Sequence, residues 1–583
     1  MLISVLVEVK SLNEKTFIYS VPSNLSNKVS IGVRISVPFG NRVVYGLVLD
    51  YVSSSNYDTK DIISVLDDNP IFSKELIELG KTMSKMYLCS LMSAYESMLP
   101  SALKFNNNNI KIKYETFYKL VKNLDNPSKG EKNILDLFSD NEVVKSSLIK
   151  NKVVLKRLID NNILEKVLYE KYRLNSNYKK VGLNALTEKQ KEVYDNIIST
   201  DKMVTVLRGV TGSGKTEIYM HLIDRIINEN KKAIVLVPEI SLTTQLIDRF
   251  RGVFSDNIAV LHSSLSDGER YDEWRKIKEN KVSLVIGTRS AIFSPIENIG
   301  IIIIDEEQED TYKQENNPRY RTIDMAIERA KYNNAKIVLG SATPSLESYA
   351  KGMVGRYNLI ELLERVNNNS LPTVHIVDMK EEIKKGNSIL SSHAINLIND
   401  RLSKKEQMMI LINRRGYSNY LLCNECGNVL KCPNCDISLT YHKSNNTLRC
   451  HYCGYATIKP NNCSKCNSKY LILKGIGTEK IEEYLNDNFN ARVIRMDRDS
   501  TTNKGMHEKI INDFNNYKYD ILLGTQMISK GLDFANVTLV IVLNGDSNLN
   551  IPDYRSAEKT FDMLTQVSGV PQPDPACLQR LRG

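Results

Sequence analysis

The chain has 583 residues, of which 42% are hydrophobic and 25% are charged. This composition excludes global disorder and collagen-like repeats and leaves room for several domains. The 78 basic and 68 acidic residues give a formal net charge of +10, which permits a polyanionic partner without proving one. No segment approaches the ~18 consecutive apolar residues of a membrane-spanning helix. Met1–Lys10 predicts a strand rather than a signal peptide, so we expect a cytoplasmic protein.

The first part of the chain, residues 1–104, is predicted to be a β-rich domain followed by a helical run from Ser73 to Leu99. Residues 110–178 form the next expected domain. Helical patterns at Glu131–Phe138, Val143–Leu148 and Lys152–Asn161 precede an alternating segment, Ile163–Tyr172, that predicts a two-stranded wing. This order favours a winged-helix module, and the alternative is a small structural helical domain. The expected strands of the first domain are Ile3–Val9, Thr16–Val21, Gly32–Val37 and Val43–Leu49.

From residue 183 onward, apolar β-runs alternate with helical patterns. Their continuous Val, Ile and Leu content is typical of parallel strands that are buried on both faces. Because there are more runs than the strands of a typical single sheet, we predict an α/β fold with two lobes, at residues 183–365 and 366–583. The runs are Val204–Leu207, Ala233–Val237, Leu284–Ile286, Ile301–Ile304, Ile337–Leu339, Met408–Ile412, Arg492–Met496, Ile521–Leu523 and Leu539–Leu543.

A phosphate-binding loop is predicted at Gly209–Thr216, which matches the Walker A pattern between an expected strand and an expected helix. Backbone N–H groups of such a loop and the following helix N-terminus bind phosphate oxygens. Lys215 is expected to reach the β- and γ-phosphates of ATP, and the Thr216 hydroxyl to bind Mg²⁺. The alternative is a chance glycine-rich turn. The glycines of the loop are Gly209, Gly212 and Gly214.

An acid pair follows the run Ile301–Ile304 and completes this prediction. Asp305 is expected at the carboxyl edge of the sheet, where open α/β sheets bind ligands. It would hold Mg²⁺, while Glu306 would polarise the attacking water. The alternative is a solvent-facing acid pair after an ordinary strand.

Further segments match superfamily 2 helicase motifs in their order. Gln190, before the phosphate loop, is expected to recognise adenine. Val237–Thr243 and Gly287–Ser290, which includes Arg289, are expected to contact a nucleic-acid backbone. Gly340–Pro344 resembles the motif that couples ATP state to movement, and Gly524–Phe534 resembles a second-lobe motif, with Gly531 and Asp533 near the nucleotide. Each motif alone is weak, whereas the ordered set is strong.

The segment Asp310–Arg321 mixes cations with aromatic residues directly after the acid pair. Cations neutralise phosphates, and tyrosine rings can stack on bases. We therefore predict a loop that senses single-stranded DNA, against the alternative of a solvated charged loop. Its candidate DNA-binding residues are Tyr312, Lys313, Arg319 and Tyr320.

Eight of the ten cysteines form four Cys-x-x-Cys pairs inside an insertion of the second lobe, residues 420–470. Each pair offers two thiolates, so the set predicts two closed, structural Cys₄ sites for two Zn²⁺ ions. Spacing alone does not decide which pairs share an ion. Free or redox-active thiols are the alternative. The predicted ligands are Cys423, Cys426, Cys432, Cys435, Cys450, Cys453, Cys463 and Cys466.

Together these motifs resemble the primosomal protein N′ (PriA) family of replication-restart helicases, from residue 1 to about Gly569. The resemblance implies a 3′-to-5′ DNA helicase that recognises abandoned forks and D-loops and initiates primosome assembly, with single-stranded DNA-binding protein among its partners. It also implies that the first Cys pair joins the fourth and the second joins the third. The remaining residues that carry it are Val37–Gly40, Tyr312–Gln314, Pro318–Tyr320, Asn413–Tyr417, Leu543, Asn544 and Asp546.

The same resemblance implies that the N-terminal domain binds the 3′ end of a DNA strand through Phe17, Gly40 and Lys60. A residue that is usually aspartate beside the phenylalanine is Ile18 here, and the alternative for Phe17 is a place in the core. The family's usual histidine after the acidic residues is Gln308, which is expected to hydrogen-bond across to a γ-phosphate sensor.

The resemblance breaks after Gly569, where three prolines in a short tail cannot continue a helix. We expect a truncation, frameshift or artificial junction, and a chain that binds ATP and DNA but hydrolyses ATP slowly or not at all, because the last arginine motif is missing. A non-enzymatic fork-binding platform for primosome assembly is the main alternative function. An RNA helicase or a restriction-type translocase is a third.

Overall fold

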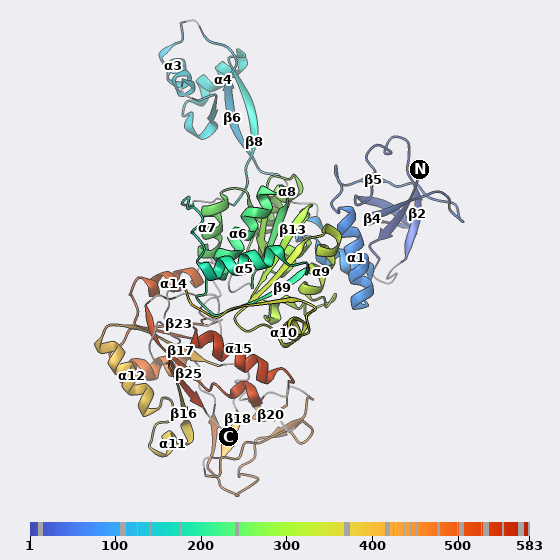
Figure 1. Cartoon of the computed structure of the whole chain (residues 1–583). Coiled ribbons are helices and arrows are strands. Elements are labelled where there is room, and N and C mark those ends of the chain that lie inside the picture. The colour runs from blue at the N-terminus through green and yellow to red at the C-terminus, as the bar shows by residue number, and fades with distance from the viewer. Residues whose placement is uncertain are drawn as a thin grey trace. The chain divides into compact units, whose positions relative to one another are not determined.

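The computed structural model (Figure 1) describes most of the 583 residues, which cluster into two compact units. The first unit is Met1–Lys180 with Phe254–Glu297 and Gln314–Arg329, and the second holds the rest of the chain. No described helix is long and apolar enough to cross a membrane. The description leaves out residues 10–14, 105–111, 125, 140, 175–177, 239–243, 367–372, 414–419, 424, 436–437, 443–445, 451–452, 475–477, 498–499, 501–505, 526–527, 529–533, 535, 551–552, 570–575 and 581–583.

The first unit begins with an antiparallel sheet in the order β2-β1-β4-β3-β5. Ile3, Val5, Ile35 and Val48 are fully buried and form its core, as the β-rich pattern predicts. Its strands are β1 (Leu2–Val7), β2 (Thr16–Ser20), β3 (Arg34–Phe39), β4 (Arg42–Val52) and β5 (Ser64–Val65).

The helical run from Ser73 to Leu99 is two helices rather than one. Helix α1 (Lys74–Tyr87) ends at Leu88, whose φ of 50° is left-handed, and α2 (Leu91–Met98) begins after Ser90. Ser73 and Ser90 each accept a hydrogen bond from a backbone N–H of the following helix, as N-cap residues do.

Residues 114–170 form a small module with a three-stranded antiparallel sheet in the order β7-β6-β8. Its elements are β6 (Tyr114–Leu120), α3 (Lys129–Leu135), β7 (Val143–Lys145), α4 (Lys152–Asp160) and β8 (Leu164–Glu170).

Two details of the winged-helix prediction were wrong. Val143–Leu148 is strand β7 and a 3₁₀ turn, because β-branched valines favour a strand. Ile163–Tyr172 is not a two-stranded wing, because β8 pairs along its length with β6.

The helicase sheet of the second unit is parallel, in the order β10-β13-β14-β9-β15. Ile301 to Ile304 are at most 2% exposed, as the unbroken apolar run predicts. Its strands are β9 (Val204–Gly209), β10 (Lys232–Leu236), β13 (Ile299–Asp305), β14 (Lys336–Ser341) and β15 (Asn358–Leu362). Its helices are α5 (Glu188–Ser199), α6 (Lys215–Asn228) and α10 (Leu346–Met353).

The first unit contains a parallel pair, β11 (Ile258–Leu261) and β12 (Leu284–Gly287), with helix α8 (Asp267–Lys278) between them in the chain. Helices α7 (Thr244–Phe254) and α9 (Thr322–Asn333) each cross the boundary between the units.

A second parallel sheet confirms the second lobe, in the order β16-β26-β25-β17-β24-β23. Two apolar clusters form its core. Its strands are β16 (Val374–Asp378), β17 (Gln407–Ile412), β23 (Val493–Met496), β24 (Ile521–Gly524), β25 (Val537–Leu543) and β26 (Ala576–Arg580). Its helices are α11 (Met379–Lys384), α12 (Ser392–Ser403), α13 (Thr478–Asn488), α14 (Met506–Asn515) and α15 (Ser556–Ser568).

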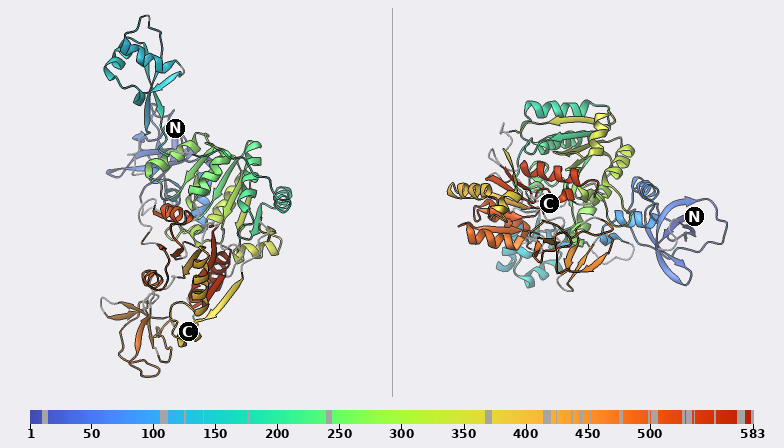
Figure 2. Two further views of the ribbon diagram at one scale, coloured as in Figure 1. Left: turned by 90° about the vertical axis from the view of Figure 1, so that its left-hand side faces the viewer. Right: turned by 90° about the horizontal axis from the view of Figure 1, so that it is seen from below.

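The cysteine-rich insertion lies in the chain between β17 and α13, as predicted, and is an antiparallel sheet in the order β21-β20-β19-β18-β22 (brown strands in Figures 1 and 2). Its strands are short, so the apolar surface that they can bury is small. They are β18 (Tyr420–Cys423), β19 (Thr440–His442), β20 (Thr447–Arg449), β21 (Ala456–Ile458) and β22 (Leu471–Lys474).

Candidate functional site

The phosphate-binding loop joins the end of β9 to the start of α6. Gly212 and Gly214 both have φ of +79°, a left-handed conformation that glycine adopts without steric cost. The Lys215 ammonium donates a hydrogen bond to the Gly209 carbonyl at 2.7 Å. Thr216 is the second residue of α6. The strand, loop and helix therefore have the order that the sequence predicts.

Gln190 is tied to this loop. Its Nε2 donates to the Ser213 carbonyl at 3.1 Å, and its Oε1 accepts from the Thr187 backbone N–H at 2.9 Å. The side chain is 3% exposed, and a Cβ on Gly214 would overlap its amide. Contact with adenine stays a prediction. Gly531 and Asp533 lie outside the described residues.

The acid pair lies at the carboxyl end of β13. The Tyr219 hydroxyl donates to Asp305 Oδ1 at 2.9 Å. Burial, followed by the charge of Glu306, raises the pKa of Asp305 to about 6. A cation such as Mg²⁺ favours the charged form of a carboxylate, so the donor set fits the predicted metal. Sequence reasoning missed Tyr219, although it lies four residues after Lys215 and so on the same face of α6.

A chain of hydrogen bonds connects Glu306 with β14. Glu306 has φ of 47°, and its Oε2 accepts from Gln308 Nε2 at 2.7 Å. Gln308 Oε1 accepts from the Ser341 hydroxyl at 2.5 Å, and Ser341 Oγ in turn accepts from the Thr343 backbone N–H at 2.8 Å. Gln308 therefore bonds across to the Gly340–Pro344 motif, while its predicted bond to a γ-phosphate sensor stays a prediction.

Glu307 serves a different purpose from its two acidic neighbours. It is 2% exposed and accepts hydrogen bonds from the Ser345 backbone N–H at 2.6 Å and from the Ser348 hydroxyl at 3.1 Å. These bonds hold the start of α10 against the acid pair.

The two tyrosines of the predicted DNA-sensing loop are buried, each 2% exposed. The Tyr312 hydroxyl donates to the Asp305 carbonyl at 2.7 Å, and the Tyr320 ring packs edge-on against Phe293 with centroids 5.0 Å apart. Burial raises the pKa of Tyr320 to about 12. A buried ring offers no free face to a base, so base stacking does not fit these rings as they lie here.

The cations near this loop are more accessible. Lys313 and Arg319 are exposed, and Arg289, which begins the 3₁₀ helix Arg289–Phe293, is half-buried and interacts with Tyr320. In the other segment predicted to contact a nucleic-acid backbone, Val237 and Pro238 are buried and residues 239–243 lie outside the described residues, as do residues 414–417 of the Asn413–Tyr417 segment.

The predicted 3′-end residues lie around β2 in the first unit. Phe17 packs edge-on against Phe39 with centroids 5.2 Å apart, and it is half-buried at the margin of the core. Gly40 has φ of +59° in the exposed turn after β3, with open space where a Cβ would be. Lys60 is exposed, and its carbonyl accepts from the Ser20 backbone N–H at 3.0 Å.

The eight cysteines of the insertion form two clusters. In each cluster the four sulfur atoms lie within 4.8 Å of one another, and each cluster joins two Cys-x-x-Cys pairs. The first pair joins the fourth and the second joins the third, as the family resemblance implies. The clusters are Cys423, Cys426, Cys463 and Cys466, and Cys432, Cys435, Cys450 and Cys453.

Their chemistry fits a thiolate-bound metal. Cys423 and Cys466 have sulfur atoms 3.4 Å apart, and the Lys465 backbone N–H donates to Cys463 Sγ at 3.4 Å. A hydrogen bond from the Tyr455 backbone lowers the pKa of Cys453 to about 6, and bonds from the Cys466 and Lys465 backbone do the same for Cys463. Burial raises the pKa of Cys435 to about 12, and the hydrogen bond with Cys426 raises that of Cys466 to about 12, so the grouping of the sulfur atoms rather than the pKa values indicates the metal site. Four thiolates in one compact cluster are the ligand set of a structural zinc site.

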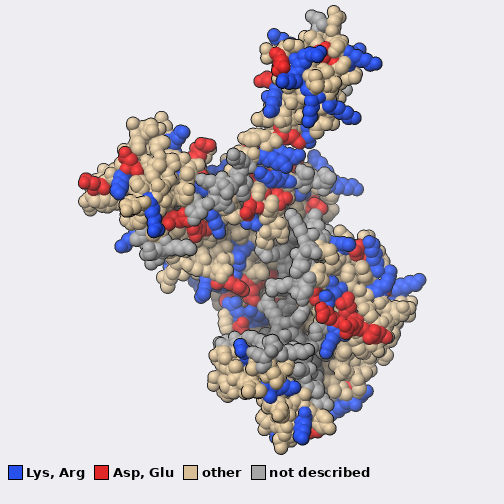
Figure 3. All heavy atoms as spheres, turned by 180° about the vertical axis from the view of Figure 1, so that it is seen from behind, with Lys and Arg blue, Asp and Glu red and all other residues tan. Residues whose placement is uncertain are grey.

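The small module of β6 to β8 carries many cations, and Figure 3 shows Lys and Arg atoms over it. The exposed cations on and beside α4 are Lys150, Lys152, Lys156 and Arg157. They would neutralise phosphates if the module met DNA.

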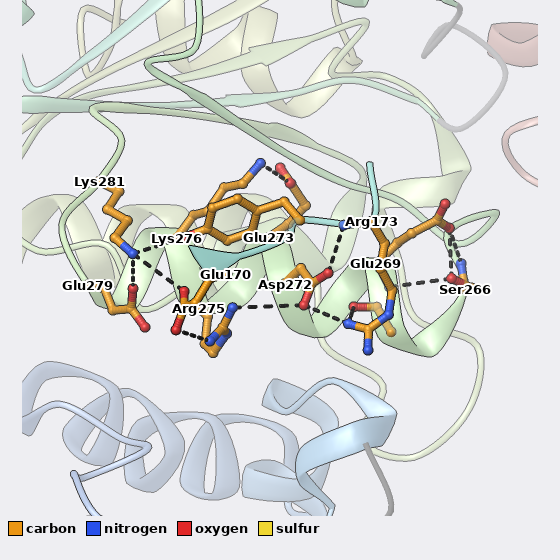
Figure 4. A network of polar contacts seen from close by, with 12 residues as sticks. Glu170, Arg173, Ser266, Glu269, Asp272, Glu273, Arg275, Lys276, Glu279 and Lys281 are labelled. Atoms are coloured by element: carbon orange, nitrogen blue, oxygen red, sulfur yellow. Dashed lines mark hydrogen bonds and ion pairs between the residues drawn. The ribbon is translucent and has the colours of Figure 1, made fainter. Parts of the chain in front are cut away.

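A polar network fixes the segment after β8 to α8 (Figure 4). Arg173 donates to fully buried Asp272 from its backbone N–H at 2.9 Å and from its guanidinium at 2.7 Å. Glu170 accepts from Arg275 at 3.0 Å. Before the module in the chain, the hydroxyl of Ser101 donates to Asp267 of α8.

Four family models match the chain. They describe a 3′ DNA-binding domain at residues 4–100, a DEAD/DEAH box helicase at 187–351, the Cys-rich region of PriA DNA helicase at 432–457 and a helicase conserved C-terminal domain at 465–569. Among solved structures, RecG bound to a three-way DNA junction covers 68% of this chain, and the chain covers 43% of RecG, at 17% identity and a TM-score of 0.39.

Curated relatives cover more of the chain. The replication restart protein PriA of Bacillus subtilis is 41% identical over 97% of this chain and 81% of its own length. The protein of the same name from Chlamydia muridarum is 36% identical over 94% of this chain and 77% of its length, and that from Synechocystis is 46% identical over 69% and 50%. By its sequence, its sheets and its paired cysteine clusters, the chain belongs to the PriA family of replication restart proteins.

Proposed function

We propose that this chain recognises stalled or abandoned replication forks and D-loops and moves 3′-to-5′ along DNA to initiate primosome assembly. Membership of the family makes it an ATP-dependent DNA helicase of replication restart. The observation that carries the proposal is that the loop leading to Lys215 follows β9 and that Asp305 and Glu306 come at the end of β13, both at the carboxyl edge of one parallel sheet, where such sheets bind ligands.

Each group of the site has a role in this proposal. Bound ATP with Mg²⁺ supplies a phosphoryl group for transfer to water. Lys215 and the backbone N–H groups of its loop bind the phosphates, while Thr216 and Asp305 are the side chains that would hold the magnesium ion. Glu306 orients the water and accepts its proton. Through the hydrogen bonds described above, Gln308 and Ser341 connect Glu306 to the end of β14, so that a shift of Glu306 also shifts the end of that strand.

The DNA contacts are proposed from charge and exposure. Arg289, Lys313 and Arg319 bind the phosphate backbone, while Tyr312 and Tyr320 fix the loop that carries two of these cations. Phe17, Gly40 and Lys60 bind the 3′ end. The turn at Gly40 is open and has no side chain there, so the DNA can approach the backbone closely.

The two cysteine clusters bind one Zn²⁺ each and hold the insertion in its fold. By family resemblance, single-stranded DNA-binding protein and other primosome proteins are the protein partners. We propose the cytoplasm as the location, because the DNA substrate is there.

Substitution of the phosphate-binding lysine tests the enzymatic part. Lys215→Ala is expected to abolish ATP hydrolysis and unwinding of forked DNA while fork binding remains. Lys191→Ala, at an exposed position of α5, is the matched control and is expected to keep full activity. If Lys215→Ala unwound forks as well as the control, the helicase site would lie elsewhere.

Substrate choice tests the rest. Unwinding is measured on DNA with a single-stranded 3′ tail, on DNA with a 5′ tail and on duplex RNA. Activity restricted to the first supports the proposal. Preference for RNA contradicts it, and fork binding without unwinding by the unaltered chain favours an assembly platform.

A further inference from the structure

Helix α1 of the N-terminal domain bonds to helix α9 at both of its ends. Near its start, Glu75 accepts from Arg329 Nε at 2.6 Å. At its last residue, the Tyr87 hydroxyl donates to Asp324 Oδ2 at 2.5 Å. All four residues belong to the first unit, and more than 230 positions of sequence separate the partners.

The contact at Glu75 is a fixed attachment. Arg329 is 1% exposed, and its guanidinium also donates to the carbonyls of Ile292, Ser294 and Ile296 at 2.7 to 3.0 Å. A buried charge is tolerated when it is paired and hydrogen-bonded in this way. These three carbonyls lie at and beyond the end of the 3₁₀ helix that Arg289 begins. The attachment therefore connects the N-terminal domain with the segment that carries a candidate DNA-binding residue.

The contact at Tyr87 reaches the loop that follows the acid pair. Besides donating to Asp324 in the first turn of α9, the Tyr87 hydroxyl accepts from the Arg321 backbone N–H at 2.9 Å. Arg321 is the last residue of the loop Asp310–Arg321. One tyrosine hydroxyl from the N-terminal domain thus fixes both the end of the loop and the beginning of the helix after it.

The other end of the same loop is fixed in a similar manner. There the Tyr312 hydroxyl donates to the carbonyl of Asp305, a residue of the proposed magnesium site. Exposed Lys313 and Arg319 lie between these two fixed ends. Lys313 thus directly follows a residue that is bonded to the acid pair, and Arg319 lies two residues before one that is bonded to the N-terminal domain.

We propose that Tyr87 is a positioning residue that couples 3′-end binding on the N-terminal domain to DNA-stimulated ATP hydrolysis through the loop Asp310–Arg321. This inference rests on the proposed function of both sites. Tyr87 touches neither nucleotide nor DNA. It changes how strongly a bound 3′ end stimulates hydrolysis, because it sets where the loop ends.

The test uses Tyr87→Phe in the full chain, with two forks that differ only in whether the leading-strand 3′ end is free or blocked by a 3′ phosphate. For each fork, both the DNA affinity and the DNA-stimulated ATPase rate are measured. In the unaltered chain, both are expected to favour the free end. Tyr87→Phe is expected to keep the affinity preference and the ATPase rate with plain single-stranded DNA. The ratio of its ATPase rate with the free-end fork to its rate with the blocked fork should fall by about three- to tenfold, which is the effect expected from the loss of one or two hydrogen bonds.

Tyr95→Phe is the matched control. The Tyr95 hydroxyl donates to the Ile77 carbonyl at 2.9 Å inside the α1–α2 pair, so this change also removes a buried hydroxyl from the domain. It is expected to leave the ATPase preference intact. Asp324→Asn keeps an oxygen acceptor for Tyr87 and should behave like the unaltered chain, whereas Asp324→Ala should behave like Tyr87→Phe.

The possible failures are distinguishable. If the unaltered chain shows no preference in affinity, the proposed 3′-end site is wrong. If that preference is present and Tyr87→Phe keeps the full ATPase preference, the coupling role of Tyr87 is overturned. Equal loss of preference in Tyr87→Phe and Tyr95→Phe also overturns it, because a general loosening of the domain would then explain both.

Discussion

The parallel helicase sheet and the cysteine-rich insertion are stabilised in different ways. In the sheet, β13 alone contributes Ile302, Ile303 and Ile304, all fully buried. In the insertion, the apolar cluster consists of Leu421, Leu439 and Leu448 together with two of the cysteines themselves. Apolar burial stabilises the first region, whereas the described residues of the second bury little apolar surface, and the zinc ions proposed for its thiols would supply the remaining stability.

The largest expected effect is the loss of metal from the insertion. A structural zinc site contributes about 10–16 kcal/mol to the folding of a small domain. A strong chelator, or Cys463→Ser, should therefore unfold residues 420–470 and leave the helicase sheet folded. Limited proteolysis with measurement of bound zinc checks this, and Lys215→Ala should retain two zinc ions. Cleavage that spreads into residues 183–365 would contradict the independence of the two regions.

A cavity in the sheet is the corresponding test of the apolar region. Ile303→Ala should lower the free energy of unfolding by about 2–5 kcal/mol. The substitution removes buried methyl and methylene groups and leaves a cavity that the surrounding side chains cannot fill. Thermal unfolding in the presence and absence of a chelator measures this. The loss should be the same in both conditions, and a chelator-dependent loss would mean that the insertion supports the sheet.

Close packing beside the acid pair gives a smaller effect. A Cβ at Gly340 would overlap the Tyr219 hydroxyl, which is bonded to Asp305. We expect Gly340→Ala to destabilise the protein by about 1–3 kcal/mol and to reduce kcat, because Asp305 loses its partner. Tyr219→Phe should reduce kcat with a smaller loss of stability, since it removes the bond without crowding. Normal kcat in both variants would show that the bond has no catalytic importance.

The smallest expected effect concerns one polar link at the edge of the sheet. Gln308→Ala removes the bonds to Glu306 and Ser341, each of which contributes about 0.5–1.5 kcal/mol. The coupling of ATP hydrolysis to DNA unwinding should fall several-fold, while the melting temperature hardly changes. Base pairs unwound per ATP hydrolysed is the quantity to measure. Gln308→Glu, which loses the amide donor to Glu306, should also be impaired.

The features that could be predicted from the sequence are those that depend on a local pattern of residues. The unbroken apolar runs gave the parallel strands, because a strand buried on both faces has no polar positions. The phosphate loop and the four cysteine pairs were recognised from their spacing, because their chemistry demands that spacing. The break at Leu88 escaped prediction, since apolar periodicity continues across it and only the backbone conformation reveals the turn.

Long-range pairs could not be predicted. Nothing near Arg329 in the sequence indicates that Glu75 lies beside it, and nothing near Tyr87 points to Asp324. The aromatic residues of the predicted DNA-sensing loop were expected to face DNA, whereas Tyr312 and Tyr320 are buried. An aromatic ring between charged residues has the same sequence pattern whether it packs inward or outward, and only tertiary structure decides.

The attachment of the small module to α8 has a consequence for protein engineering. Ser101 before the module and Arg173 after it bond to Asp267 and Asp272, two residues of one helix. The two aspartates lie about 7.5 Å apart along the helix axis, so the chain enters and leaves the module beside neighbouring turns of α8. Excising the module should leave a foldable remainder, and a different domain of similar end spacing could be grafted in its place.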